Sequence, residues 1–327
     1  MKIMVYEARP DERADLEKQA ALHGVELSVT DAVPTLENAS LAAGCIGVSI
    51  LGQGCIDAAL LDAYHALGIR YLSTRTIGYD HIDLDHARSI GLRVCSASYA
   101  PNGVADFTVM MILMCLRHYK QALWRGQVND FSLTGLQGRE MKDLTIGIIG
   151  TGRIGAQVAR NLSGFGCRIL AYDLRHNPAV EPQVTYVDFD TLLAQSDVIT
   201  LHMPLLDSNR HIINRESVAK MRDGVVIVNC SRGELADIEA LIEGIETGKI
   251  GALGMDTVEG DEGIIHADHR VDILPNRNWF YLHQFRNVIM TQHMAFYTEQ
   301  AVDSMVQCGI EGIVKMAEEG TYPTMLD

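Results

Sequence analysis

The stretch from residue 145 to residue 173 limits the possible folds of this chain more than any other. It reads TIGIIGTGRIGAQVARNLSGFGCRILAYD. A short apolar run of the buried-strand kind leads directly into glycines spaced as G-x-G-x-x-G. Apolar residues then recur every three or four positions, as on one face of a helix, and a second apolar strand ends on Asp173. The order strand, glycine turn, helix, strand predicts a βαβ unit that binds a dinucleotide.

Each glycine of this motif has a physical task. Gly150 permits the tight turn, Gly152 lets the backbone approach a pyrophosphate, and Gly155 lets the helix pack closely on the strand. The free N–H groups and the positive dipole at the helix start would hold the phosphates. Arg153 and Ile154 lie at that helix start and are predicted to contact the cofactor.

Asp173 indicates which dinucleotide is bound. It lies eighteen residues after the last glycine of the motif. There its carboxylate can accept hydrogen bonds from the 2′- and 3′-hydroxyls of a ribose. The same negative charge would repel a 2′-phosphate, so the sequence favours NAD over NADP as the cofactor.

Composition excludes several classes of partner. A chain of 327 residues with 47% hydrophobic content predicts about two domains with buried cores. The net charge of −15 disfavours nucleic acid and anionic membranes as partners. Seven scattered cysteines without a C-x-x-C pair indicate a reducing, cytoplasmic location. The N-terminus does not resemble a signal peptide, and the longest apolar run, 109–116, is too short to span a membrane.

Strand and helix patterns alternate along the whole chain. In the first hundred residues they predict a small parallel α/β domain, with strands at 2–6, 46–51, 71–72 and 90–95 and helices at 11–23 and 60–67. A break at 98–104 precedes a long apolar helix at 107–124 and an irregular arm to about 142. After the glycine motif we expect strands at 198–202, 225–229, 251–255 and 288–291, helices at 215–221 and 238–247, and a final helix at 297–319.

Two residues directly after predicted strands suggest redox chemistry. In open α/β sheets, ligands bind outside the carboxyl ends of the strands. Arg232 follows the strand at 225–229, and its planar guanidinium suits a carboxylate. His293 follows the strand at 288–291, and histidine transfers protons readily near neutral pH. A nicotinamide enzyme needs both kinds of group.

The motifs together resemble the D-2-hydroxyacid dehydrogenase family over nearly the whole chain. The matching segments are STRTIGYDHID (73–83), YAPNGVAD (99–106), GTGRIG (150–155), HMPL (202–205), NCSRG (229–233) and HMAFYT (293–298). Within the family the chain is most similar to the D-lactate dehydrogenase branch, which includes the VanH-type enzymes. Asp173 differs from the residue of VanH-type sequences at this position and is typical of enzymes that use NAD.

The resemblance implies roles for particular residues. His293 would be the general acid/base, and Arg232 would bind the substrate carboxylate and polarise the C2 oxygen. The backbone N–H groups of Ile77 and Gly78 would hold the far side of that carboxylate, and Tyr99 would line the substrate pocket. The remaining cofactor contacts implied by the family are Met203 and Pro204 beside adenine, Cys230 and Ser231 at the nicotinamide ribose, Asp256 at the nicotinamide end, and Asn209.

Two positions depart from the family pattern. The family pairs its histidine with a glutamate five residues after the aspartate that ends the GMD strand, and here that position is Asp261. An aspartate is one methylene shorter, so we favour Asp261 as the partner of His293. The alternatives are that Glu262 takes this role by a one-residue shift or that neither carboxylate does. Gln292 replaces the proline that usually precedes the histidine.

The implied fold is two doubly wound parallel-sheet α/β domains with a cleft between them. Residues 1–100, completed by a C-terminal helix at 298–327, would form a flavodoxin-like substrate domain, and 101–297 a Rossmann NAD-binding domain. The long helix and the arm, 104–142, would make a homodimer contact. His266, His269 and Asp268 lie in a polar loop without further spaced ligands, so we predict no metal site.

The implied activity is the reduction of pyruvate to D-lactate with NADH. The alternative substrates are larger 2-oxo acids, namely 2-oxoisocaproate, phenylpyruvate or 2-oxoglutarate. An alternative of another class is an NAD-sensing binding protein like the C-terminal binding protein corepressors.

Overall fold

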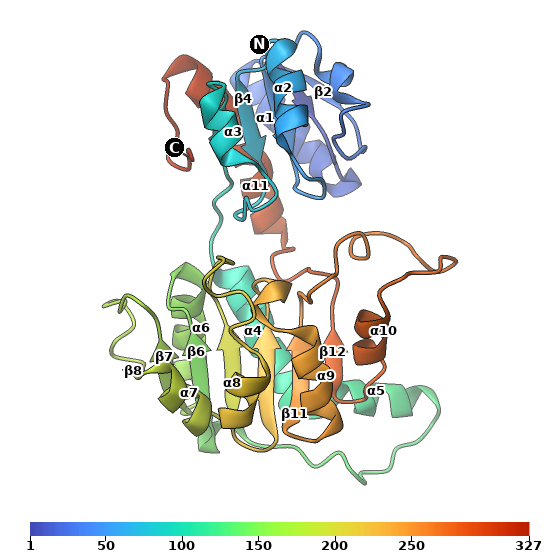
Figure 1. Cartoon of the computed structure of the whole chain (residues 1–327), viewed down its shortest axis with the longest axis vertical. Helices are drawn as coiled ribbons and strands as arrows, with labels where there is room; N and C mark the ends of the chain where they lie inside the picture. The colour runs from blue at the N-terminus through green and yellow to red at the C-terminus, as the bar shows by residue number, and fades with distance from the viewer. Residues whose placement is uncertain (327) are drawn as a thin grey trace. The chain divides into compact units, whose positions relative to one another are not determined.

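The computed structural model describes residues 1–326 and divides into two compact units. The first unit contains residues 1–100 and the segment from Tyr297 onward, and the second is Pro101–Phe296. Figure 1 shows a separate sheet with its own helices in each unit. The predicted α/β class with two parallel sheets is confirmed.

The first unit is built on a five-stranded parallel sheet in the order β2-β1-β3-β4-β5, which is the flavodoxin-like order. Ile3 and Val5 point to the helices on one face, whereas Met4 and Tyr6 join the core on the other, as the period of two in a strand requires. The strands are β1 (Lys2–Val5), β2 (Glu26–Val29), β3 (Gly47–Ile50), β4 (Tyr71–Thr74) and β5 (Arg93–Cys95). The helices α1 (Arg13–His23) and α11 (Glu299–Glu318) cover one face, and α2 (Ala58–Ala66) and α3 (Leu84–Ser89) cover the other.

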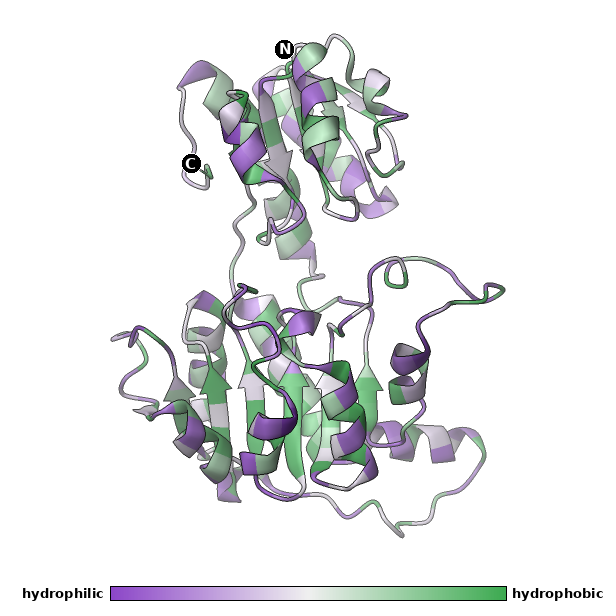
Figure 2. Ribbon diagram, in the orientation of Figure 1, coloured by the Kyte–Doolittle hydropathy of each residue, from purple (hydrophilic) through white to green (hydrophobic). Residues whose placement is uncertain are grey.

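The second unit is built on a seven-stranded parallel sheet in the order β12-β11-β10-β9-β6-β7-β8. Chain order reverses between β6 and β9, and ligands bind at such a switch point. The strands are β6 (Thr145–Ile149), β7 (Arg168–Tyr172), β8 (Thr185–Tyr186), β9 (Val198–Leu201), β10 (Val225–Asn229), β11 (Ile250–Met255) and β12 (Val288–Met290). Figure 2 shows the apolar colour concentrated on its central strands, as in a sheet with both faces covered.

Helices cover both faces of the second sheet. On one face α4 (Asn102–Leu116) packs against α6 (Arg153–Ser163) and the central strands. The other face is covered by α7 (Phe189–Gln195), α8 (Arg215–Lys220), α9 (Ile238–Glu246) and α10 (Arg277–His283). No helix in the described range 1–326 is both long and apolar enough to cross a membrane.

The single helix predicted at 107–124 is wrong. The structure has α4, which ends at Leu116, and a separate α5 (Tyr119–Gln127). His118 between them has a φ of +51°, a conformation that stops an α-helix. The Leu116 carbonyl accepts a hydrogen bond from the distant N–H of Arg139 (3.1 Å). This contact with the arm that follows α5 ends the helix, and the local sequence pattern does not predict it.

Charged side chains fix the carboxyl edge of the first sheet. The carboxylate of Glu7 accepts hydrogen bonds from the backbone N–H groups of Gly52 (2.8 Å), Gln53 (2.9 Å), Gly54 (3.1 Å) and Leu51. Glu7 has a φ of +55°, which is uncommon outside glycine. A buried carboxylate thus organises the loop that follows β3.

An ion pair lies beside this loop. Arg75 and Glu12 are both fully buried, with 3.1 Å between Nε and Oε1. The guanidinium also donates to the carbonyls of Tyr6 (3.0 Å) and Glu7 (3.2 Å). Arg75 follows β4, so the loop that begins after β4 starts from a rigid position.

Candidate active site

The turn between β6 and α6 brings the three motif glycines together. Gly150 has a φ of +93°, and a Cβ there would lie 2.5 Å from a backbone carbonyl oxygen after β9. A Cβ on Gly155 would lie 1.9 Å from the Gly150 carbonyl oxygen, so α6 reaches β6 because this residue is glycine. A Cβ on Gly152 would meet nothing within 4 Å. Gly152 is the N-cap of α6, whose first residues are Arg153 and Ile154, so this open space fits a pyrophosphate.

Asp173 follows β7 directly and is held beside this turn. Its Oδ2 accepts hydrogen bonds from the N–H (2.6 Å) and the Oγ1 (3.1 Å) of Thr151, and its Oδ1 from the N–H of Arg175 (3.0 Å). Burial alone would raise the pKa of this carboxyl, but the hydrogen bonds from Arg175 and Thr151 hold it below its usual value. Asp173 is therefore anionic at neutral pH, as recognition of an unphosphorylated ribose requires.

The loop after β9 carries the residues predicted beside adenine. Asn209 donates from Nδ2 to the carbonyl of Pro204 (2.8 Å) and accepts from the N–H of Leu206 (2.8 Å). Ser231, which lies just after the neighbouring strand β10, donates from Oγ to the carbonyl of Met203 (2.6 Å). The segments predicted to contact adenine and the nicotinamide ribose are thus hydrogen-bonded to each other.

The turn after β10 presents Arg232. Asn229, the last residue of β10, accepts from the N–H of Ser231 (3.0 Å) and donates to the carbonyl of Arg232 (2.7 Å). The Arg232 guanidinium donates to the Ser231 carbonyl (2.9 Å). Burial raises the pKa of the Cys230 thiol, so it stays protonated and is unsuited to act as a nucleophile.

Asp256, directly after β11, holds the loop that carries His293. Its Oδ1 accepts from Thr291 Oγ1 (2.5 Å) and the N–H of Met294 (2.9 Å), and its Oδ2 from the N–H of Ala295 (2.8 Å). Asp256 is 1% exposed. His293 lies inside this loop with a φ of +53°, a conformation that needs support from its surroundings. The structure therefore positions His293 through Asp256.

The environment of His293 favours the neutral imidazole. Burial lowers its pKa to about 4; Arg232 and His266 act in the same direction, and Asp256 opposes them. The His266 ring lies 6.1 Å from the His293 ring, centroid to centroid, and its Nε2 donates to the His293 carbonyl (3.2 Å). The ring of Phe296 lies edge-on to that of His293, at 6.2 Å. Arg232 and His293 are thus electrostatic neighbours at the ends of β10 and β12.

The two candidate partners of His293 lie in the loop after β11. Asp261 accepts from the N–H of Val258 (3.1 Å), and burial raises its pKa to about 6. Glu262 is exposed. In the described part of the chain neither carboxylate is hydrogen-bonded to the His293 ring.

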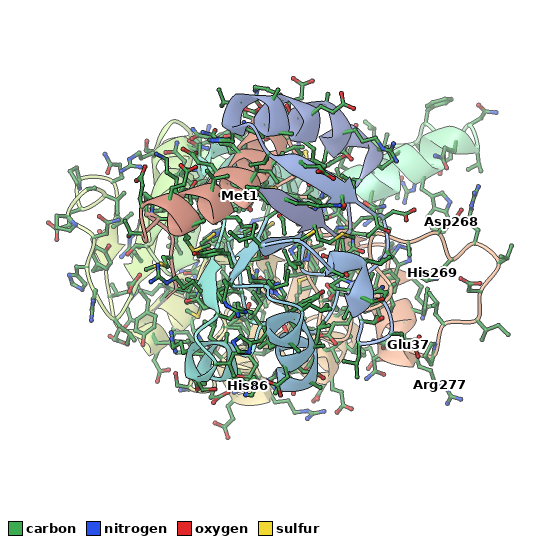
Figure 3. The ribbon with its side chains drawn as sticks, turned by 90° about the horizontal axis from the view of Figure 1, so that it is seen from above. Met1, Glu37, His86, Asp268, His269 and Arg277 are labelled. Carbon is green, nitrogen blue, oxygen red and sulfur yellow. The ribbon has the colours of Figure 1, made fainter. Side chains whose placement is uncertain are left out.

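In the same loop His269 contacts Asp272 (2.8 Å), and Figure 3 labels His269 and Asp268 there.

The loop predicted to hold the far side of the substrate carboxylate belongs to the first unit. Thr76 Oγ1 donates to the Gly78 carbonyl (2.6 Å), which fixes the turn after β4. The N–H groups of Ile77 and Gly78 have no acceptor among residues 1–326. Two adjacent free donors suit an anionic ligand. Tyr99 is half-buried.

Sequence reasoning missed several residues that support these groups. Thr151 bonds Asp173 and Thr291 bonds Asp256 from separate segments, and Tyr186 bonds Thr151. His266 lies beside His293, although in the sequence it belongs only to a polar loop. Spacing along the chain carries no signal for such contacts, although Thr151 lies inside the glycine motif.

Comparisons with known proteins agree with the family that the sequence motifs resemble. Residues 109–295 match the family described as D-isomer specific 2-hydroxyacid dehydrogenase, NAD binding domain. The chain is 40% identical over 325 residues to an aromatic 2-oxoacid reductase of Clostridium sporogenes, with 98% of both chains covered. It is 36% identical over 328 residues to a D-lactate dehydrogenase of Escherichia coli, with 100% of both covered.

Solved structures agree. The chain superposes on a NAD-complexed D-isomer specific 2-hydroxyacid dehydrogenase from Lactobacillus delbrueckii ssp. bulgaricus with a TM-score of 0.86, 31% identity and complete coverage of both chains. It superposes on a D-2-hydroxyisocaproate dehydrogenase with a TM-score of 0.89 and 30% identity, covering 100% and 99% of the two chains. The predicted cofactor, NAD, is confirmed by these relationships.

Proposed function

Because the chain belongs to the D-isomer specific 2-hydroxyacid dehydrogenase family and is an NAD-dependent oxidoreductase, we propose that it reduces pyruvate to D-lactate with NADH. The observation that carries the proposal is the convergence of Arg232, Asp256 and His293 at the carboxyl ends of three adjacent strands. The relatives reported above are enzymes, which favours the oxidoreductase over the corepressor-like alternative.

In the proposed mechanism Arg232 binds the substrate carboxylate and polarises the C2 carbonyl oxygen. The free N–H groups of Ile77 and Gly78 hold the same carboxylate from the substrate domain. Bound NADH supplies the hydride that C2 accepts. His293 Nε2 or Nδ1 donates a proton to the carbonyl oxygen and recovers it when the hydroxy acid is oxidised.

A carboxylate partner would give His293 the proton it needs for reduction. With a pKa of about 4, the imidazole in this structure is ready to act as a base at neutral pH. Contact with an anionic Asp261 would raise the pKa of the imidazole and lower that of the carboxyl, since opposite charges stabilise each other. We therefore assign the partner role to Asp261 and keep Glu262 as the alternative.

The catalytic assignment is tested with His293→Gln. Turnover should fall by orders of magnitude while NADH still binds, measured by nicotinamide fluorescence. Near wild-type turnover would contradict the assignment. For the partner, the pH profiles of Asp261→Asn and Glu262→Gln are compared. The role belongs to the residue whose loss removes the upper-pH limb of pyruvate reduction, and two unchanged profiles would refute the pairing.

The size of the 2-oxo acid substrate is tested separately. The similarity to an aromatic 2-oxoacid reductase and to a D-2-hydroxyisocaproate dehydrogenase favours a larger 2-oxo acid as the alternative to pyruvate. We expect NADH oxidation to be fastest with pyruvate in a panel that adds 2-oxoisocaproate, phenylpyruvate and 2-oxoglutarate. A higher kcat/KM with phenylpyruvate would transfer the assignment to the aromatic class. Chiral analysis of the product checks the D configuration.

We also propose a homodimer through α5 and the arm. This segment exposes a series of large apolar side chains: Tyr119, Leu123, Trp124, Val128, Phe131 and Leu133, the last 83% exposed. A second copy would cover them. Light scattering should give a dimer for the wild type and a monomer for Trp124→Asp/Phe131→Asp; an unchanged mass would contradict the proposal.

A cytoplasmic location is supported by the cysteines. All seven are unpaired in the structure, as in a reducing compartment. Cell fractionation tests this location.

A further inference from the structure

A hydrogen-bond series connects Asp173 to two residues outside the glycine spacing. Thr151 lies between the first two motif glycines, and Tyr186 is the last residue of the edge strand β8. The Tyr186 hydroxyl lies 2.8 Å from Thr151 Oγ1, which lies 3.1 Å from Asp173 Oδ2. The N–H of Asn177 lies 2.8 Å from the Tyr186 hydroxyl. Four residues from three segments are thus connected by consecutive hydrogen bonds.

The positions of the protons in this series follow from chemistry alone. An ionised Asp173 can only accept, so Thr151 Oγ1 donates to it. Having used its proton, Thr151 Oγ1 accepts from Tyr186. The backbone N–H of Asn177 can only donate, so the Tyr186 hydroxyl accepts from it and donates to Thr151. Every hydroxyl therefore has one donor and one acceptor, and all the bonds point toward the Asp173 carboxylate.

Further contacts keep the series rigid. Asn177 Nδ2 donates to the Thr151 carbonyl (2.8 Å), and Asn177 Oδ1 accepts from the N–H of Ala179 (3.1 Å). The Tyr186 ring stacks on the ring of His176, with 3.9 Å between centroids and 11° between planes. The segment after β7 is therefore attached to the glycine turn through the side chain of Asn177 and to Tyr186 of β8 through the ring of His176.

From this geometry we infer that Thr151 and Tyr186 are positioning residues that set the preference for NAD over NADP by fixing the carboxylate of Asp173. A carboxylate excludes a 2′-phosphate only if it stays where that phosphate would lie. Thr151 supplies two of the hydrogen bonds that keep it there, and Tyr186 orients the Thr151 hydroxyl. Without them, Asp173 can rotate away and admit the larger anion.

The inference rests on the use of NAD and not on the identity of the 2-oxo acid. Its first measurement is accordingly the ratio of the NADPH and NADH dissociation constants, obtained by fluorescence without substrate. The second is the ratio of kcat/KM for the two cofactors with pyruvate. If pyruvate is not a substrate, the binding ratio still decides the inference.

The expected effect is a loss of selectivity and not of turnover. Thr151→Val keeps the side-chain shape but loses the hydroxyl, and it should lower the NADH-over-NADPH preference about tenfold, since a hydrogen bond to a charged group is lost. Tyr186→Phe should lower it less, because Thr151 can still donate. Turnover at saturating NADH should remain near wild type in both.

Two comparisons separate positioning from simple damage. Thr151→Ser keeps the hydroxyl and should retain the wild-type ratio. The double variant Thr151→Val/Tyr186→Phe should be no less selective than Thr151→Val, because Tyr186 acts through Thr151. Tyr281→Phe, which removes a tyrosine hydroxyl bonded to Glu246 (2.6 Å), is the matched control and should leave the ratio unchanged.

Two results would overturn the inference. One is an unchanged cofactor ratio in Thr151→Val, whether both cofactors bind as in wild type or both bind equally more weakly. The other is an additive loss of selectivity in the double variant, which would mean that Tyr186 acts independently of Thr151.

Discussion

Replacing Asp256 by asparagine should misplace His293 while leaving most of the fold intact. Asp256 accepts three hydrogen bonds from the loop that carries His293. An amide has one acceptor oxygen. If the asparagine oxygen takes the place of Oδ1, the bonds from Thr291 and Met294 are kept, and the NH2 group then faces the N–H of Ala295. The Ala295 N–H is buried and loses its acceptor.

The size of the effect follows from these contacts. A buried donor without a partner costs about 1–3 kcal/mol. The remaining two bonds become neutral and lose about half of their strength. The total is about 2–4 kcal/mol, and each ~1.4 kcal/mol is a factor of ten. Turnover should therefore fall at least tenfold in Asp256→Asn, with a limit of about a thousandfold if all of the cost falls on the loop.

The assay combines turnover, pH and hydrogen exchange. Asp256 raises the pKa of His293, so its neutralisation should move the acid limb of D-lactate oxidation to lower pH. Exchange at Met294 and Ala295 should accelerate. Thr291→Val is the control: it removes one donor, keeps the carboxylate, and should leave the acid limb in place. A turnover within twofold of wild type, together with unchanged exchange, would refute this account of how His293 is held.

Three further outcomes are expected. Gly155→Ala should abolish NADH binding and lower the melting temperature, because its Cβ cannot lie 1.9 Å from a backbone carbonyl; NADH-dependent thermal stabilisation that persists would contradict this. Arg75→Met should lower the free energy of unfolding of the first unit by about 3–5 kcal/mol, because it leaves Glu12 buried and unpaired, and the added change Glu12→Leu should restore part of this stability. Because both tryptophans lie in the other unit, the measurement is hydrogen exchange of β1 and β4, and a loss under about 1 kcal/mol would contradict the prediction. In urea unfolding at different pH values, His293→Gln should gain stability relative to wild type as pH falls from 6.5 to about 4, because burial lowers the pKa of His293 in the folded state. Asp261→Asn should instead gain stability relative to wild type as pH rises from 3.8 to about 6, because burial raises the pKa of Asp261 in the folded state. If the stability differences of the two variants changed with pH in the same direction, these environments would be disproved.

The sequence predicted the parts of the molecule that depend on local pattern. Strand ends are marked by apolar runs, so the places of Arg232 and His293 after β10 and β12 could be expected. The glycine turn could be expected because its task requires glycine at fixed spacing. The short strand β8 could not, since two residues show no periodicity.

What the sequence could not predict depends on pairs of residues distant in the chain. The break after Leu116 comes from a hydrogen bond with Arg139. Glu7 organises a loop more than forty residues further along. Such contacts exist only once the sheets have formed, so no spacing rule describes them.

The anchoring by Asp256 has a mechanical consequence. The chain crosses between the two units at 100/101 and again at 296/297. The second crossing comes three residues after His293, yet Asp256 already binds the N–H groups of Met294 and Ala295. The segment that Asp256 holds therefore extends past His293 on both sides, from Thr291 to Ala295. The proton carrier keeps a fixed position relative to the glycine turn, because its anchor Asp256 and that turn follow strands of the same seven-stranded sheet.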